Sequence, residues 1–117
     1  MAMGIVACGN SETFPRTELF EGITEGDYDR GQRLLRQRIE SRFKVGDSEE
    51  GLEAFLRSQG LNTRRNETSE APGTPIYGEA VATHEGPCDQ IVRVNWRADH
   101  QRIIRELVVS YSSEGCL

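Results

Sequence analysis

Apolar residues recur every four positions between Asp27 and Phe43, and this spacing predicts a helix. Thr24 or Asp27 is placed to cap its amino terminus. The apolar face is formed by Leu35, Ile39 and Phe43. The other face carries a run of arginines, namely Arg30, Arg33, Arg36, Arg38 and Arg42. Such a run is usually a solvated helix face, and docking on an acidic partner or on anionic lipid is the alternative.

A second, shorter helix is predicted to begin at Asp47. Asp47 is placed to cap the free amides, and Glu50 stands where a capping-box carboxylate returns the bond. Its apolar stripe consists of Leu52, Phe55 and Leu56. Gly60 supplies a left-handed stop and Leu61 the hydrophobic contact that commonly follows it. Residues 62–74 show no apolar periodicity, which predicts a surface loop.

The rest of the chain has the alternation of β-strands. Strands are predicted over 76–83, 90–97 and 103–111. In the second strand, Val92, Val94 and Trp96 share one face, whereas Arg93, Asn95 and Arg97 share the other. In the third, one face is expected to hold Ile103, Leu107, Val109 and Tyr111, with Arg105 interrupting it. A hairpin centred between Asp99 and His100 would bring Cys88 close to Tyr111.

This order of elements predicts an α+β fold. Two helices are expected to pack on one face of a three-stranded antiparallel sheet, in the order α-α-β-β-β. Residues 27–117 would form this single domain, and residues 1–26 a partial signal, lipobox and tether. The candidates within the tether to dock on the domain are Phe14, Leu19, Phe20 and Ile23.

The net charge and the apolar runs of the chain argue against nucleic-acid binding and against a membrane-spanning segment. The chain has 117 residues and a formal net charge of −5. An acidic chain lacks the clustered Lys and Arg that phosphate contacts require, so no nucleic-acid partner is expected. The chain also has no apolar run near the roughly 20 residues that span a bilayer.

The three cysteines bear on the compartment. Cys8 ends the stretch Ile5-Val6-Ala7-Cys8, which resembles the lipobox of bacterial lipoproteins, where the cysteine is lipidated. If Cys8 is the anchor, Cys88 and Cys116 remain as an even pair, and a disulfide between them is expected in an oxidising compartment. The alternative is a chance Ala-Cys near the terminus and two free cytosolic thiols.

Two stretches carry a family resemblance. Val45-Gly46-Asp47-Ser48 opens a short helix, and Val92–Asp99 runs as a strand into an Asp-containing hairpin. Within 45–61 and 90–111, this resembles the small outer-membrane lipoproteins of the SmpA/OmlA (BamE) type. The fold of that family is shared with β-lactamase inhibitory protein domains. The resemblance implies a role in envelope assembly, or inhibition of an enzyme, by protein binding.

Candidate chemistry is sparse. His84 and His100 complete no ligand set with the cysteines, and Glu49-Glu50 stands at a helix start, where the dipole favours acidic residues. We therefore expect no catalytic residues, no metal and no cofactor, and thus no enzyme.

The second strand supplies the candidate binding residues. Arg93, Asn95 and Arg97 form either a docking surface or a plain solvated face, and Trp96 is either a core residue or a partner-binding anchor. The expected protein is a lipoprotein that faces the periplasm, is held at the outer membrane through Cys8, and binds another protein. That partner would be an envelope component or a secreted hydrolase. The alternative is a cytoplasmic α+β ligand-binding domain or enzyme with free thiols.

Overall fold

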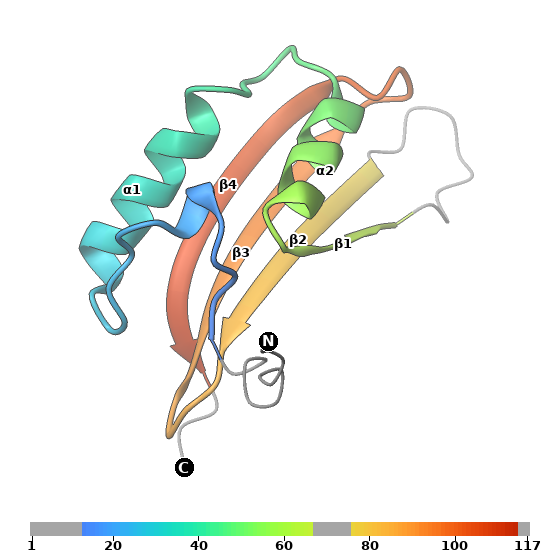
Figure 1. Cartoon of the computed structure of the whole chain (residues 1–117). Helices are drawn as coiled ribbons and strands as arrows, with labels where there is room; N and C mark the ends of the chain where they lie inside the picture. Colours follow the sequence, from blue (N-terminus) through green and yellow to red (C-terminus); the bar gives the residue numbers. More distant parts are fainter. Residues whose placement is uncertain (1–12, 67–75, 115–117) are drawn as a thin grey trace, which may run out of the picture.

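The computed structural model describes residues 13–66 and 76–114 (Figure 1). A short 3-10 helix, η3, spans Glu18–Phe20. Two α-helices follow, α1 at Tyr28–Glu40 and α2 at Glu49–Ser58. The strands are β1 at Asn62–Arg65, β2 at Ile76–His84, β3 at Asp89–Ala98 and β4 at Ile104–Glu114.

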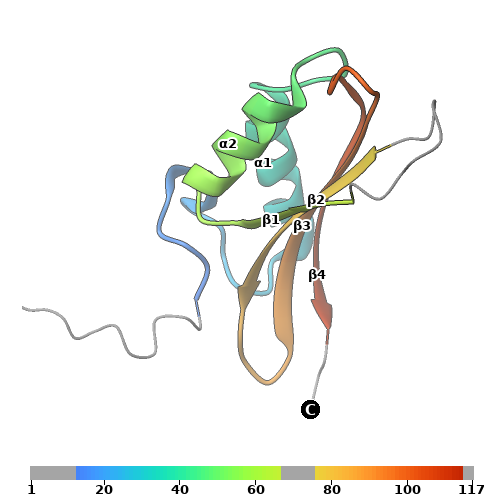
Figure 2. The same cartoon turned by 90° about the vertical axis from the view of Figure 1, so that its right-hand side faces the viewer.

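The strands form one antiparallel sheet in the order β1-β2-β3-β4. Both helices and the segment before α1 lie on the same side of this sheet (Figure 2). No helix of the described part of the chain covers the other side. The α+β class and the placement of two helices on one face are therefore confirmed.

The predicted number of strands was wrong, because β1 lies in the stretch expected to be a loop. β1 pairs with β2 from Asn62 opposite Val81 to Arg65 opposite Gly78. Its sequence, Asn-Thr-Arg-Arg, contains no apolar residue. Backbone pairing with the next strand, β2, creates this element, and hydrophobic alternation cannot reveal it.

Both helices begin close to their predicted starts. Asp27 occupies the cap position of α1, but its side chain makes no capping hydrogen bond. The cap of α2 is Ser48 and not Asp47. The Ser48 hydroxyl accepts from the Glu50 amide at 3.2 Å, whereas the Asp47 carboxylate accepts from the Lys44 amide at 2.9 Å. The hydrogen bonds of the preceding turn thus shift the start of α2 by one residue.

The predicted end of α2 is confirmed. Gly60 has a φ of +96°, in the left-handed region that glycine adopts without steric cost. The Leu61 amide donates to the Leu56 carbonyl at 3.1 Å, and the Gly60 amide donates to the Arg57 carbonyl at 3.0 Å. This pair of bonds is a Schellman motif, which directs the chain into β1.

A β-bulge changes the predicted register of the last strand. Arg97 lies opposite Glu106 and Ala98 opposite Ile104, so Arg105 has no partner position. Ile104, and not Ile103, is therefore the buried residue at this end. Beyond the bulge, the inward positions are as predicted: Leu107, Val109 and Tyr111.

The predicted centre of the hairpin was also wrong. Ala98 pairs with Ile104, which centres the hairpin on Gln101 and not between Asp99 and His100. Tyr111 therefore lies opposite Val92 and not beside Cys88.

The core lies between the helices and the sheet. Leu35 and Ile39 from α1, together with Leu52 and Leu56 from α2, are fully buried against the inner face of the sheet. Leu19 and Phe20 are buried in the same core, while Phe14 and Ile23 pack against it. The predicted docking of these four residues is confirmed, and the segment before α1 is packed on the domain.

Candidate functional site

The side of the sheet away from the helices is the candidate site, and we call it the outer face. Its residues alternate along the strands with the buried residues of the inner face. They are Asn62 and Arg64 on β1; Tyr77, Glu79, Val81 and Thr83 on β2; Asp89, Ile91, Arg93, Asn95 and Arg97 on β3; and Glu106, Val108, Ser110, Ser112 and Glu114 on β4.

Two large apolar side chains project from the outer face. Tyr77 is 53% exposed and Val108 is 50% exposed. The third exposed large apolar residue of the described chain, Val45 at 58%, lies in the turn between the two helices. Tyr77 lies opposite Arg97 and Val108 opposite Asn95. Tyr77 and Val108 therefore stand on either side of β3 and two residues apart along it, which separates their Cα positions by roughly 12 Å.

Two shallow hollows lie beside Tyr77. The smaller has a volume of about 160 Å³ and is lined by Tyr77, Asn95, Trp96, Arg97, Glu106 and Val108. The larger has a volume of about 330 Å³ and is lined by Arg64, Arg65, Asn66, Tyr77, Gly78, Glu79 and Asn95. Tyr77 and Asn95 border both, so they form the centre of this surface.

The charged side chains of the outer face are paired with one another. Arg64 contacts Glu79 at 2.7 Å, and Arg97 contacts Glu106 at 3.3 Å. Arg93 holds Glu114 with both terminal nitrogens, at 2.5 and 3.4 Å. The hydrogen bond from Arg93 lowers the pKa of Glu114. The three arginines are matched by these three glutamates, and Asp89, opposite Glu114, leaves the outer face with one net negative charge.

The structure brings together three of the four predicted binding residues and removes the fourth. Arg93, Asn95 and Arg97 lie side by side on the outer face, but Trp96 is only 2% exposed. Its indole N–H donates to a Glu49 carboxylate oxygen at 2.7 Å on the inner side. Opposite it stands Gly78, where a Cβ would lie 2.1 Å from the indole ring. Trp96 is therefore a core residue whose ring needs the glycine.

Tyr77 and Val108 are not among the binding residues predicted from the sequence. Tyr77 sits in a strand that was predicted, but its outward direction depends on the pairing with β3. Val108 carried a usable signal, because it is an apolar residue between the inward positions Leu107 and Val109. An apolar residue at an outward position is the pattern of an interaction surface.

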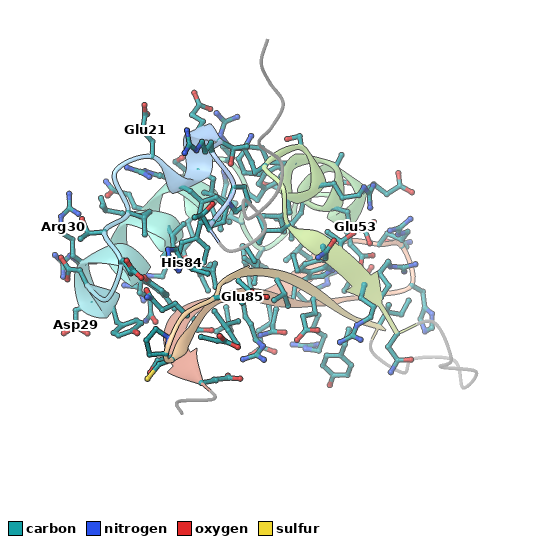
Figure 3. All side chains as sticks on the ribbon, turned by 60° about the horizontal axis from the view of Figure 1, so that its bottom comes forward. Glu21, Asp29, Arg30, Glu53, His84 and Glu85 are labelled. Atoms are coloured by element: carbon teal, nitrogen blue, oxygen red, sulfur yellow. The ribbon has the colours of Figure 1, made fainter. Side chains whose placement is uncertain are left out.

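A buried ionic cluster lies on the inner side, at the start of α2. Glu49 has no exposed surface and accepts from Arg65 Nε at 3.1 Å and from Arg102 Nε at 3.0 Å, besides the Trp96 bond. Glu53, which Figure 3 shows between α2 and β1, accepts from Arg102 at 2.7 Å. Burial would raise the pKa of Glu49, but the bonds from Trp96, Arg102 and Arg65 together lower it.

His84 lies under the segment that precedes α1 (Figure 3). Its Nδ1 is 3.6 Å from a Glu25 carboxylate oxygen, and its ring meets the Phe14 ring edge-on at 5.4 Å between centroids. A hollow of about 630 Å³ opens beside these residues. Within the described residues, no group of three or more His, Cys, Asp or Glu side chains is placed to hold a metal ion.

The cysteine predictions fall mostly outside the described residues. Cys88 is disulfide-bonded. Cys8 and Cys116 both lie outside the described ranges, so lipidation at Cys8 and the Cys88–Cys116 pairing stay predictions.

Comparison with protein families, with curated proteins and with solved structures finds no match for this chain. The resemblance to outer-membrane lipoproteins therefore rests on the residues quoted for it. Across the part of the chain that the structure describes, no helix has the length and apolar character needed to cross a membrane.

Proposed function

We propose that the protein is a periplasm-facing lipoprotein that binds another protein through its outer face. The observation that carries this proposal is the pair of exposed apolar side chains, Tyr77 and Val108, on a sheet face that no described helix covers. Exposed apolar groups that cluster mark interaction surfaces more often than single ones do. Tyrosine and arginine are also enriched among the residues that dominate binding energy.

The outer face suits a protein partner better than a charged polymer. Its ion pairs are internal and it carries one net negative charge, so it offers no positive field to attract nucleic acid or a strongly acidic chain. A sheet face is also rigid, which limits the entropy lost on binding. The partner we propose is an envelope component or a secreted hydrolase.

The compartment is supported by Cys88. A disulfide-bonded cysteine is typical of secreted and periplasmic proteins and rare in the cytosol. This bond weighs against the alternative, a cytoplasmic ligand-binding domain or enzyme with free thiols. Labelling of cells with a palmitate analogue tests the anchor: we expect label on the wild type and none on Cys8→Ser. Absence of label from the wild type, expressed with its native upstream codons, contradicts the lipoprotein part of the proposal.

The binding surface is tested with variants matched for exposure. The wild type, the double variant Tyr77→Ser/Val108→Ser and the control Val45→Ser are used to capture proteins from the envelope of the native host. A protein captured by the wild type is identified by mass spectrometry and purified, and its Kd for each variant is measured by calorimetry. We expect Val45→Ser to bind like the wild type and the double variant to bind at least about tenfold more weakly.

The outcome also separates the two partner classes. An outer-membrane assembly component supports the accessory role, and a single soluble hydrolase supports inhibition or immunity. Equal affinity of the double variant and the wild type for the purified partner would contradict binding through the outer face.

A further inference from the structure

We infer that the smaller hollow of the outer face receives one apolar side chain of the partner, next to a carboxylate that Arg97 binds. This inference rests on the proposed function and specifies the chemistry of the partner at that site. It predicts that the recognised segment contains an aliphatic or aromatic residue beside Asp or Glu.

The size of the hollow limits what can enter it. Its volume is about 160 Å³. Small-molecule sites usually measure about 300–1,000 Å³, so this hollow is too small for such a ligand. It is close to the roughly 150 Å³ of an engineered cavity in another protein that holds one benzene molecule. One leucine- or phenylalanine-sized side chain, flanked by Tyr77 and Val108, therefore fits.

Arg97 is the outer-face arginine with donors still available at this hollow. Among the described hydrogen bonds it makes a single one to a side chain, from Nε to Glu106 at 3.3 Å. Both terminal nitrogens of its guanidinium remain, and they match the two oxygens of a carboxylate. By contrast, Arg93 already uses both terminal nitrogens on Glu114. Arg64 lines the other hollow.

Glu106 also lines the hollow and would repel an incoming carboxylate. Its side chain is 59% exposed, and its contact with Arg97 is one bond of 3.3 Å. Exposed pairs of this kind are worth about 0–1 kcal/mol, so the partner's carboxylate can share Arg97 or displace Glu106 at little cost. A buried glutamate in the same place would have excluded the acidic group.

Asn95 supplies the remaining recognition element. It is exposed and lines the hollow together with Tyr77 and Val108, and no described hydrogen bond uses its side-chain amide. An amide both donates and accepts, so it can pair with a peptide group of an extended segment. The three features together describe a short stretch of partner backbone with one apolar side chain inserted and one carboxylate alongside.

The experiment is selection from a random peptide library displayed on phage. The full-length protein is the target, together with Arg97→Gln, the matched control Arg93→Gln, and Tyr77→Ser. We expect the wild type and Arg93→Gln to enrich peptides with Leu or Phe beside Asp or Glu. Arg97→Gln should keep the apolar preference and lose the acidic one.

A synthetic copy of the most enriched peptide makes the test quantitative. Replacing its Asp or Glu by Asn or Gln should weaken binding to the wild type about tenfold or more, because a charge-assisted bidentate bond to Arg97 is lost. The same replacement should leave binding to Arg97→Gln nearly unchanged, because that variant cannot form the bond. Such a pattern over two proteins and two peptides is a double-mutant cycle, which isolates the contact.

Different results would contradict this inference alone or the proposed function as well. If Arg97→Gln retains the acidic preference, if Arg93→Gln loses it, or if the wild type enriches no peptide, the inference is overturned. If the wild type selects apolar peptides without an acid and Tyr77→Ser abolishes them, the inference fails but the proposed function stands. If Tyr77→Ser selects the same peptides as the wild type, binding occurs elsewhere and the outer-face proposal fails as well.

Discussion

At the scale of single residues, Glu49 joins three parts of the fold. Its carboxylate binds Arg65 from β1, Trp96 from β3 and Arg102 from the hairpin between β3 and β4. The Glu49 amide also donates to the Arg102 carbonyl at 2.7 Å. Arg102 has a φ of +63°, an uncommon conformation for a residue with a side chain. The contacts to Glu49, Glu50 and Glu53 hold it there.

Replacing Glu49 should therefore destabilise the protein far more than replacing its neighbour. We expect Glu49→Gln to lower the free energy of unfolding by about 2–3 kcal/mol, because buried arginine contacts lose their charged acceptor. Glu50→Gln is the control, since the Glu50 side chain is 68% exposed and contacts the same Arg102. It should cost less than about 0.5 kcal/mol. Urea denaturation of both variants measures this difference, and equal losses would refute it.

The same carboxylate should make stability depend on acid. The pKa of Glu49 is lowered in the folded protein, so its contribution is complete above the ordinary glutamate pKa of about 4.3. The contribution declines as the pH falls below that value, because the unfolded chain takes up the proton first. Between about pH 5 and pH 3, Glu49→Gln should lose less stability than the wild type. Parallel stability curves over this range would mean that Glu49 does not titrate as proposed.

Trp96 illustrates what a sequence can and cannot show about one residue. Its alternation with Val92 and Val94 predicts its face correctly, and that face is buried. Whether an inward tryptophan is core or anchor depends on Gly78, which makes room for the ring, and on Glu49, which accepts its N–H. Both partners are distant in sequence, and local pattern cannot pair them.

At the scale of elements, the predictions that succeeded rest on local physics. A glycine stop and hydrophobic spacing operate within a few residues, and they locate α1, α2 and three of the strands closely, although neither predicted capping side chain, Asp27 or Asp47, caps its helix. β1 and the bulge at Arg105 were missed because both exist only through pairing with another strand. Of the outer face, alternation predicted Arg93, Asn95 and Arg97, but it did not select Tyr77 or Val108.

Gly60 links α2 to β1, and its replacement tests that link. Alanine at a φ of +96° is strained, and a Cβ there would lie 2.6 Å from the Pro15 ring. We expect Gly60→Ala to lower the free energy of unfolding by about 1–3 kcal/mol, seen as a lower urea midpoint with an unchanged m value. Gly86→Ala is the control, because its Cβ would meet only an ordinary contact at 3.7 Å. A loss for Gly86→Ala as large as that for Gly60→Ala would contradict this account.

The edges of the sheet favour recognition through its face. On the free edge of β4, the Ile104 amide donates to the Asp47 carbonyl at 2.9 Å, and the Tyr111 amide donates to the Gln32 side chain at 3.1 Å. The opposite edge strand, β1, has only four residues. Short or occupied edges resist the addition of a partner strand. A partner strand is therefore less easily added at these edges than a partner is bound on the outer face.

At the scale of the whole molecule, the disulfide and the hollow lie toward opposite ends of β3. Cys88 immediately precedes Asp89, where β3 begins, whereas Asn95 and Arg97 lie near its other end. The separation is roughly 25 Å along the strand. Because the disulfide and the hollow are this far apart, we expect the disulfide to contribute to stability and the hollow to contribute to partner binding, each without the other.

Replacing each cysteine in turn tests both the pairing and this separation of roles. If Cys88 pairs with Cys116, the bond closes a loop of about 29 residues, and Cys116→Ser should lower the free energy of unfolding by roughly 3–4 kcal/mol. Cys8→Ser should then change nothing, and unfolded wild type without a lipid should show one titratable thiol. If Cys8→Ser lowers the free energy of unfolding and Cys116→Ser does not, Cys88 pairs with Cys8 instead.

Below its melting temperature, Cys116→Ser should still bind the selected peptide with wild-type affinity, because Tyr77, Asn95 and Arg97 are held by strand pairing far from the disulfide.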